Sequence, residues 1–402
     1  MTKPKSSYVV SYNDVTNLNF DKYFPEIVAK INKASHLAVD LEFTALGNTK
    51  TTDMNHRYAG MKQTVESATI ASIGLSIFNA SVPELTNGSV LSPNNDSDGC
   101  LPPSTTKEDI KPIKYTCDNY NLLTLKQGDI LINTSVGQFL CQHEYSFDAM
   151  FTKGIPFTPP GDMKHGNPDK RLHNLWTKIM TAMDLHNIPL ILHNGLFDLV
   201  YLYHCFIGAL PDSLGRFLVQ ITANFPSGLY DTRFMAGKAD FDATFLAYVF
   251  SKSDRLRQNR FGRNVDGEPY FVVDVNTPFI EKQLIGEKRK RPVEEEDAKL
   301  DTQIKYCISY AERGYCSNIT HKGKTAAHDI QIILDSKMGP SEYPQVYTSQ
   351  TKDEDGAHAA HFDAYMTGFS FCYFQNTFNP IIMKSCLNRM TLSGFDVPLV
   401  FP

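Results

Sequence analysis

The segment from residue 188 to residue 203 reads IPLILHNGLFDLVYLY and combines a strand, a corner and a helix. Residues 188–193 form a short apolar run of strand length, and Asn194 and Gly195 are turn-forming residues. Residues 196–206 then return as a mostly apolar helix. A buried strand that turns directly into a helix is typical of α/β sheets, so this segment predicts an α/β fold.

Strands and helices alternate on both sides of this unit. Further strands are expected over residues 37–43, 69–78 and 120–125, and helices over residues 20–33, 55–67, 136–151, 171–185, 241–250 and 362–374. Residues 79–112 are rich in Ser, Asn, Pro and Gly and are expected to form a disordered-looking surface insertion. Residues 251–300 are expected to be a charged linker with a basic run, and residues 336–356 a flexible linker.

The composition is that of a soluble globular protein. The 402 residues carry a formal net charge of -5, and 42% of them are apolar. This charge argues against a protein held on its partner by bulk positive charge, but it allows a local basic groove. The eight cysteines are scattered, which favours a reducing compartment, and the sequence predicts neither a signal peptide nor a membrane span.

Two acids lie in the segment LAVDLEFTALG, residues 37–47. Alternation along a strand places Asp40 and Glu42 on one face and their apolar neighbours on the other. Adjacent carboxylates repel each other unless a cation or a shared proton neutralises them, and carboxylates are ligands that Mg²⁺ prefers. A solvent-exposed strand face with two hydrated acids is the simpler explanation of the pair alone, and a metal site becomes the better one only with the acids elsewhere in the chain.

Two further acids lie in apolar surroundings. Asp198 follows the buried strand, and no basic residue lies between His193 and His204 to pair with it. An unpaired buried carboxylate is costly, so Asp198 needs a partner such as a metal ion. Asp363 lies in HAAHFDAYMTGFSF, five residues after His358. His358 alone fits a helix cap or a surface histidine as well as a catalytic base.

The order of these residues, D-x-E on a strand, H-N-x-x-x-D at a corner and H-x4-D at a late helix, resembles the DEDDh branch of the 3′-to-5′ exonucleases. The words SIGLSIF, FPSGLYDTRFMA and NRMTLSGFDVPL resemble the deadenylase group that contains poly(A)-specific ribonuclease, in particular its nuclear branch, to which target of early growth response protein belongs. The resemblance implies an RNase H-like mixed sheet flanked by helices, with residues 1–250 and 357–402 as the nuclease domain.

The resemblance also implies residue roles. Asp40, Glu42, Asp198 and Asp363 would be the ligands of two Mg²⁺ ions, His358 the general base, and Phe43 and Asn194 substrate contacts. Four carboxylates supply about the charge that two divalent ions need, and histidine titrates near working pH. The expected activity is hydrolysis of single-stranded RNA from its 3′ end, including oligoadenylated tails of nuclear small RNAs, with release of nucleoside 5′-monophosphates.

A small Cys/His segment is expected over residues 301–335. The resemblance suggests a zinc finger, but the third cysteine of the family pattern is missing here. Cys307, Cys316, His321 and His328 could hold Zn²⁺ with the spacing C-x8-C-x4-H-x6-H. The alternative is a degenerated finger whose cysteines are free thiols.

Two basic runs remain. Residues 288–292 read KRKRP, which is typical of a nuclear import signal or of a solvated loop, and nuclear localisation is expected. Arg255, Arg257, Arg260 and Arg263 lie around Phe261 and are suited to single-stranded RNA.

Two alternatives to the expected nuclear exoribonuclease stay open: a catalytically idle RNA-binding or scaffold protein of the same fold, and a cytoplasmic deadenylase.

Overall fold

The computed structural model describes residues 10–47, 51–81, 112–143, 145–162, 168–257, 269–276, 306–316, 328, 330–337 and 359–402. Several predictions fall outside these ranges. They concern most of the insertion at 79–112, the basic run at 288–292, the last two arginines of the other basic run, His321, His358 and most of the linker at 336–356.

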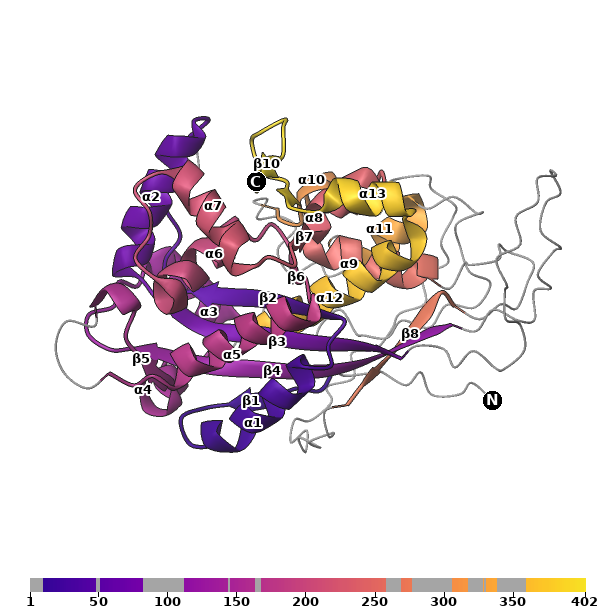
Figure 1. Cartoon of the computed structure of the whole chain (residues 1–402). Coiled ribbons are helices and arrows are strands. Elements are labelled where there is room, and N and C mark those ends of the chain that lie inside the picture. Colours follow the sequence, from indigo (N-terminus) through magenta and orange to yellow (C-terminus); the bar gives the residue numbers. More distant parts are fainter. Residues whose placement is uncertain are drawn as a thin grey trace, which may run out of the picture.

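A mixed sheet forms the centre of the structure (Figure 1). Its strands are β1 Asn13–Val15, β2 His36–Phe43, β3 Ile70–Ser81, β4 Ile113–Lys126, β5 Ile155–Phe157, β6 Leu190–Leu192, β7 Leu229–Asp231, β8 Phe271–Val275, β9 Arg389–Met390 and β10 Leu399–Val400. Their spatial order is β1-β4-β3-β2-β6-β7-β9-β10, with β5 and β8 also paired to β4. β2 is antiparallel to β3 and parallel to β6. The predicted α/β fold with a mixed sheet is confirmed.

Helices cover both faces of this sheet. They are α1 Phe20–Ile31, α2 Met54–Ser67, α3 Thr134–Gln142, α4 Phe147–Lys153, α5 Arg171–His186, α6 Leu196–Leu202, α7 Leu214–Asn224, α8 Thr232–Lys238, α9 Leu246–Arg257, α10 Ile308–Arg313, α11 Ile330–Lys337, α12 Ala360–Thr377 and α13 Pro380–Cys386. A 3₁₀ turn spans Pro160–Asp162, and a π-helical turn over Tyr203–Ile207 continues α6. None of the described helices has the length and apolar character that crossing a bilayer requires.

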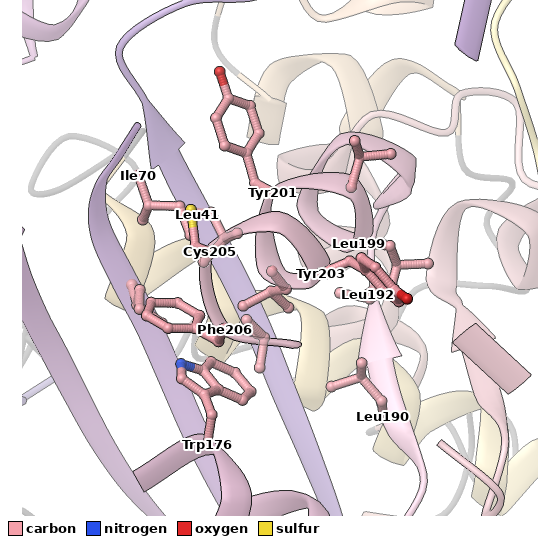
Figure 2. Close-up of a cluster of buried hydrophobic side chains, with 14 of the residues drawn as sticks. Leu41, Ile70, Trp176, Leu190, Leu192, Leu199, Tyr201, Tyr203, Cys205 and Phe206 are labelled. Carbon is pink, nitrogen blue, oxygen red and sulfur yellow. The ribbon is translucent and has the colours of Figure 1, made fainter. Parts of the chain in front are cut away.

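The two faces of β2 belong to different cores. Leu37, Val39 and Leu41 pack with side chains from α1, α5 and α6 on one face of the sheet. Figure 2 shows part of this core, including Leu41 of β2 and Tyr201 of α6. Ala38 packs instead into the core on the opposite face, together with residues of α8, α9 and α12. Because side chains alternate along a strand, Asp40 and Glu42 share the face of Ala38, which is the face that α12 covers.

A glycine in β3 allows α12 to approach the sheet closely. Gly74 is the cross-strand partner of Asp40, and a Cβ atom placed on it would overlap the backbone carbonyl of Ala360 in the first turn of α12. Gly368, two turns further along α12, lies in the same way against the ring of Phe78. The contact at Gly74 therefore brings the start of α12 next to the middle of β2.

We predict that Gly74→Ala lowers the free energy of unfolding by roughly 1–3 kcal/mol, because the added methyl group overpacks a backbone contact that cannot yield easily. Urea-induced unfolding would measure the change. Gly237→Ala in α8 is the matched control, since a Cβ atom there meets nothing within 4 Å, and it should be neutral or slightly stabilising. Equal stability of the two variants would contradict the close approach of α12.

Two expectations about element boundaries are wrong. The helix expected over residues 136–151 is divided into α3, which ends at Gln142, and α4, which begins at Phe147. Ser146 caps α4 by accepting a hydrogen bond from the amide of Ala149. The charged linker expected over 251–300 contains regular structure: α9 continues to Arg257, and β8 pairs with β4. Pairing with β4 satisfies the backbone groups of a segment that composition alone marks as irregular.

The arginines of α9 are not available to RNA as expected. Arg255 and Arg257 are both buried. The guanidinium of Arg257 donates to Asp254 at 2.8 Å and to the carbonyl of Phe271 at 2.9 Å. These two arginines therefore belong to the core between α9, α12 and β8, and their predicted role in RNA binding is wrong.

Candidate active site

The carboxyl ends of the parallel strands β2 and β6 carry the first parts of the predicted site. Asp40 and Glu42 lie in β2, where both are half-buried while Leu41 between them is buried. β6 runs parallel to β2 with Leu37 opposite Leu190 and Ala38 opposite Ile191, and the chain then turns at Asn194 into α6. Asn194 adopts a left-handed conformation with φ of 56°, which asparagine tolerates better than most residues.

Asp198 lies in the first turn of α6 and is buried. Its Oδ1 accepts a hydrogen bond from the backbone N–H of Leu41 at 3.1 Å. β6 ends at Leu192, so its backbone no longer runs beside β2 at Leu41, and the carboxylate satisfies this amide instead. The hydrogen bond places Asp198 directly beside the segment that carries Asp40 and Glu42.

The fourth acid comes from a distant part of the sequence. Asp363 lies in the first turn of α12, more than three hundred positions after Glu42, on the helix that packs against β2 and β3. Carboxylate oxygens of Asp40, Glu42 and Asp363 all lie within 4.8 Å of one another. We call these three residues, together with the neighbouring Asp198, the acid cluster.

Negative charges dominate this cluster. Removal from water, and then the charges of Asp363, Asp198 and Glu42, raise the pKa of Asp40 well above its ordinary value. The same kinds of interaction raise the pKa of Glu42 to about 9, and burial raises that of Asp198 to about 7. Among the described residues, none of these three acids forms an ion pair with a lysine or an arginine. Carboxylate oxygens that repel one another at this spacing fit the ligand set of Mg²⁺ or Mn²⁺.

Asp231 organises the corner that leads to Asp198. Its side chain is 1% exposed and caps α8 by accepting from the amide of Phe234 at 2.9 Å. The other oxygen accepts from the amide of Gly195 at 3.4 Å. Burial raises the pKa of Asp231 to about 7. Sequence patterns alone assign no role to this residue, because the hydrogen bonds to the corner form only in the folded chain.

The two predicted substrate contacts lie beside the cluster. Asn194 is exposed at the corner before α6. Phe43, at the end of β2, is half-buried and stacks on Tyr201 with ring centroids 4.3 Å apart.

The predicted base, His358, lies outside the described residues. The other histidine of the same segment, His361, stacks on Tyr12 with ring centroids 3.5 Å apart. A ring packed in this way is a poor alternative for a base that must reach the acid cluster.

The Cys/His segment packs on the same body of the protein. Ligand atoms of Cys307, Cys316 and His328 lie within 4.8 Å of one another, and the two sulfurs are 3.5 Å apart. His328 stacks on Tyr310, and Tyr310 contacts Phe245 just before α9. Three of the four predicted zinc ligands are therefore together, and the fourth, His321, is outside the described residues.

Comparison with known proteins identifies the family. The model of the CAF1 family ribonucleases matches residues 15–175 and 169–371 of this chain. The chain belongs to the CAF1 family of ribonucleases. The pre-piRNA 3′-exonuclease trimmer of Bombyx mori is 28% identical to this CAF1-family chain over 119 residues. That match covers 27% of the chain and 21% of the trimmer, so it spans about a fifth of the relative's length.

Solved structures similar to this CAF1-family chain include two Pop2 proteins, each 16% identical to it. The RNase domain of yeast Pop2 has a TM-score of 0.40, and the alignment covers 61% of this chain and 76% of that one. S. pombe Pop2p, in a form with bound Mg²⁺ and Mn²⁺, has a TM-score of 0.41 over 61% of this chain and 83% of that one. The predicted ribonuclease family is thus confirmed by the family match.

Proposed function

We propose that this CAF1-family protein is a 3′-to-5′ exoribonuclease that depends on two divalent cations. The observation that carries the proposal is the meeting of Asp40, Glu42 and Asp363 within 4.8 Å of one another. Asp363 lies more than three hundred positions after Asp40 and Glu42, which are neighbours on one face of β2. Burying like charges together is unfavourable, so their proximity is best explained by a cationic ligand.

The acid cluster and His358 would have different roles in this hydrolysis. Asp40, Glu42, Asp198 and Asp363 would hold the cations, which when bound activate a water molecule and stabilise the leaving 3′-oxygen. His358 would accept the proton of the attacking water. Hydrolysis then breaks the P–O3′ bond of the last linkage and releases a nucleoside 5′-monophosphate, while the shortened RNA keeps a free 3′ hydroxyl.

The proposed substrate is single-stranded RNA with a free 3′ end, including oligoadenylated tails of nuclear small RNAs. Membership of a ribonuclease family and the 3′-exonuclease named among its relatives support this class. Two exposed apolar side chains also suit unpaired bases: Leu46, three residues after Phe43, is 49% exposed, and Phe139 of α3 is 39% exposed. The amide of Asn133, just before α3, donates to the carbonyl of Thr44, which joins this helix to the end of β2.

The test is an incubation of purified protein with 5′-labelled RNA carrying a 3′ oligo(A) tail and Mg²⁺. Wild-type protein should give a ladder of stepwise shorter products, whereas Asp198→Ala should give none. An RNA whose 3′ hydroxyl is blocked should resist, and an RNA blocked at its 5′ end should not. RNA that is bound by wild-type protein but never shortened would instead favour the catalytically idle scaffold.

Nuclear localisation is proposed from the KRKRP run alone. Imaging of a tagged full chain, with residues 288–291 changed to alanine, would test this role. Unchanged nuclear retention would remove the import function from this run, and cytoplasmic wild-type protein would favour the cytoplasmic deadenylase.

Zinc binding by Cys307, Cys316 and His328, with His321 as the fourth ligand, is a second proposal. The three side chains offer two thiolates and an imidazole at a spacing that tetrahedral Zn²⁺ requires. We predict about one zinc per wild-type chain by elemental analysis, as this donor set implies, and its loss in Cys307→Ser. Cys141→Ser, which changes an exposed cysteine, is the control. Wild-type protein that contains no zinc after purification without chelator would establish the free-thiol alternative.

A further inference from the structure

Two arginines from helices far apart in the sequence meet at one serine. Nη1 of Arg57 in α2 donates to the backbone carbonyl of Ser393 at 2.8 Å. Nη1 of Arg233 in α8 donates to the hydroxyl of the same serine at 2.9 Å. Ser393 lies in the loop between β9 and β10. We call Arg57, Arg233 and Ser393 the arginine cradle.

The cradle holds more positive charge than its described neighbours neutralise. Arg57 is only 7% exposed, and removal from water and the charge of Arg233 lower the pKa of Arg57. The Nε atoms of both arginines are buried and have no hydrogen-bond partner within the described part of the chain. No ion pair between described residues includes either arginine. Arg57 is buried over the ring of Phe395, and Arg233 is half-buried. The one buried donor that each keeps without a partner is costly in the absence of an anion.

The cradle adjoins the acid cluster through α8. Arg233 follows Asp231, whose carboxylate caps α8 and also accepts from the amide of Gly195 at the corner before Asp198. The charge of Arg233 acts on Asp231 and on His193, so all three lie in one neighbourhood. An anion bound between the two guanidinium groups would therefore lie close to the corner that positions the nuclease ligands.

We propose that the arginine cradle binds a backbone phosphate of the RNA strand whose 3′ end lies at the acid cluster. Guanidinium groups present paired N–H donors that match phosphate oxygens. The hydroxyl of Ser393 accepts from Arg233, and its own hydrogen is suited to a phosphate oxygen. This inference rests on the proposed exonuclease function and adds to it a site for the strand next to the reacting end.

Binding to uncleaved RNA tests the cradle separately from catalysis. Asp40→Asn serves as the parent, so that the RNA stays intact, and fluorescence anisotropy measures the dissociation constant of a labelled oligo(A) at several salt concentrations. Adding Arg233→Gln should raise the dissociation constant by about 10-fold, as expected for the loss of one charged hydrogen-bonding group. The slope of log K against log salt should fall by about 0.7, the value for one phosphate contact on a single strand.

Three further variants make the result specific. Arg216→Gln removes an exposed arginine of α7 and should change neither quantity. Ser393→Ala should weaken binding less than Arg233→Gln without changing the salt slope. Arg57→Lys keeps the charge but loses the planar fork, so it should weaken binding while leaving the salt slope unchanged. In the active chain, Arg233→Gln should raise KM by about the same factor as the dissociation constant, with kcat unchanged.

Two outcomes separate the failure of this inference from that of the proposed function. If Arg233→Gln lowers the melting temperature but leaves RNA affinity and salt slope unchanged, the arginines only fasten the loop around Ser393, and the inference is overturned. If wild-type protein never shortens RNA, while Arg233→Gln still weakens RNA binding and flattens its salt dependence, the cradle stands and the exonuclease proposal fails.

Discussion

Replacing Asp40 with asparagine should nearly abolish RNA shortening and, at the same time, make the metal-free protein more stable. Loss of one metal-binding carboxylate should slow hydrolysis by roughly 1,000-fold or more, which corresponds to about 4 kcal/mol of transition-state stabilisation. The same change removes a carboxyl group whose own pKa is raised in the folded state by removal from water and then by the charges of Asp363, Asp198 and Glu42. We expect a gain of about 1–2 kcal/mol in the free energy of unfolding at neutral pH, comparable to one pKa unit or slightly more.

The two effects are measured on the same preparation. A quenched RNA assay gives the rate, and urea unfolding in the presence of a chelator gives the stability. Asp129→Asn makes the same charge change at an exposed position and should affect neither quantity strongly. An active Asp40→Asn variant would exclude Asp40 from the metal site, whereas an inactive variant with unchanged stability would show that the four acids do not repel one another appreciably.

Raising the pH should destabilise the metal-free protein, and Mg²⁺ should reverse this trend. The pKa of Glu42 is raised from 4.5 to about 9, and those of Asp198 and Asp231 from 3.8 to about 7. Between these values the folded chain binds more protons than the unfolded chain, so the free energy of unfolding falls as the pH rises. The loss should begin above about pH 4 and continue to about pH 9, with a slope of up to about 1.4 kcal/mol per pH unit for each group.

A divalent cation acts in the opposite direction, because it binds the ionised carboxylates of the folded state. At a concentration about 100 times its dissociation constant it should add about 2.7 kcal/mol. Melting curves at about pH 5 and about pH 8, with Mg²⁺ or with a monovalent salt of equal ionic strength, would measure both effects. The Asp40→Asn/Glu42→Gln double variant is the control: it should lose the part of the pH dependence that Asp40 and Glu42 contribute and most of the response to Mg²⁺, while the part that comes from Asp198 and Asp231 stays. Metal-free wild-type protein that becomes more stable toward pH 8 would contradict the raised pKa values.

The parts of the fold that depend on residues close together in the sequence were predictable. Alternation over residues 37–43 indicated the correct faces of β2, and the corner at Asn194 and Gly195 indicated the unit of β6 and α6. Both are local properties of the chain. The ladder of hydrogen bonds between β4 and β8 is not local, which is why residues 271–275 were taken for linker.

The placement of Asp363 could be expected from the family resemblance, whereas its own segment contains no signal for it. It depends on the close packing of α12 at Gly74, a contact between segments nearly three hundred positions apart. The arginine cradle was missed for the same reason: Arg57, Arg233 and Ser393 are ordinary residues in their own segments. The arginines of α9 were misjudged because composition cannot reveal that Asp254 and Phe271 surround Arg257.

The close packing of α12 on β3 also determines when, during synthesis of the chain, the acid cluster can form. A ribosome synthesises β2 long before the helix that carries Asp363, so for most of that interval the nascent chain carries an incomplete set of cation ligands. Docking of that helix is thus a late step in assembling the acid cluster, and until then the growing chain lacks one of its four acids.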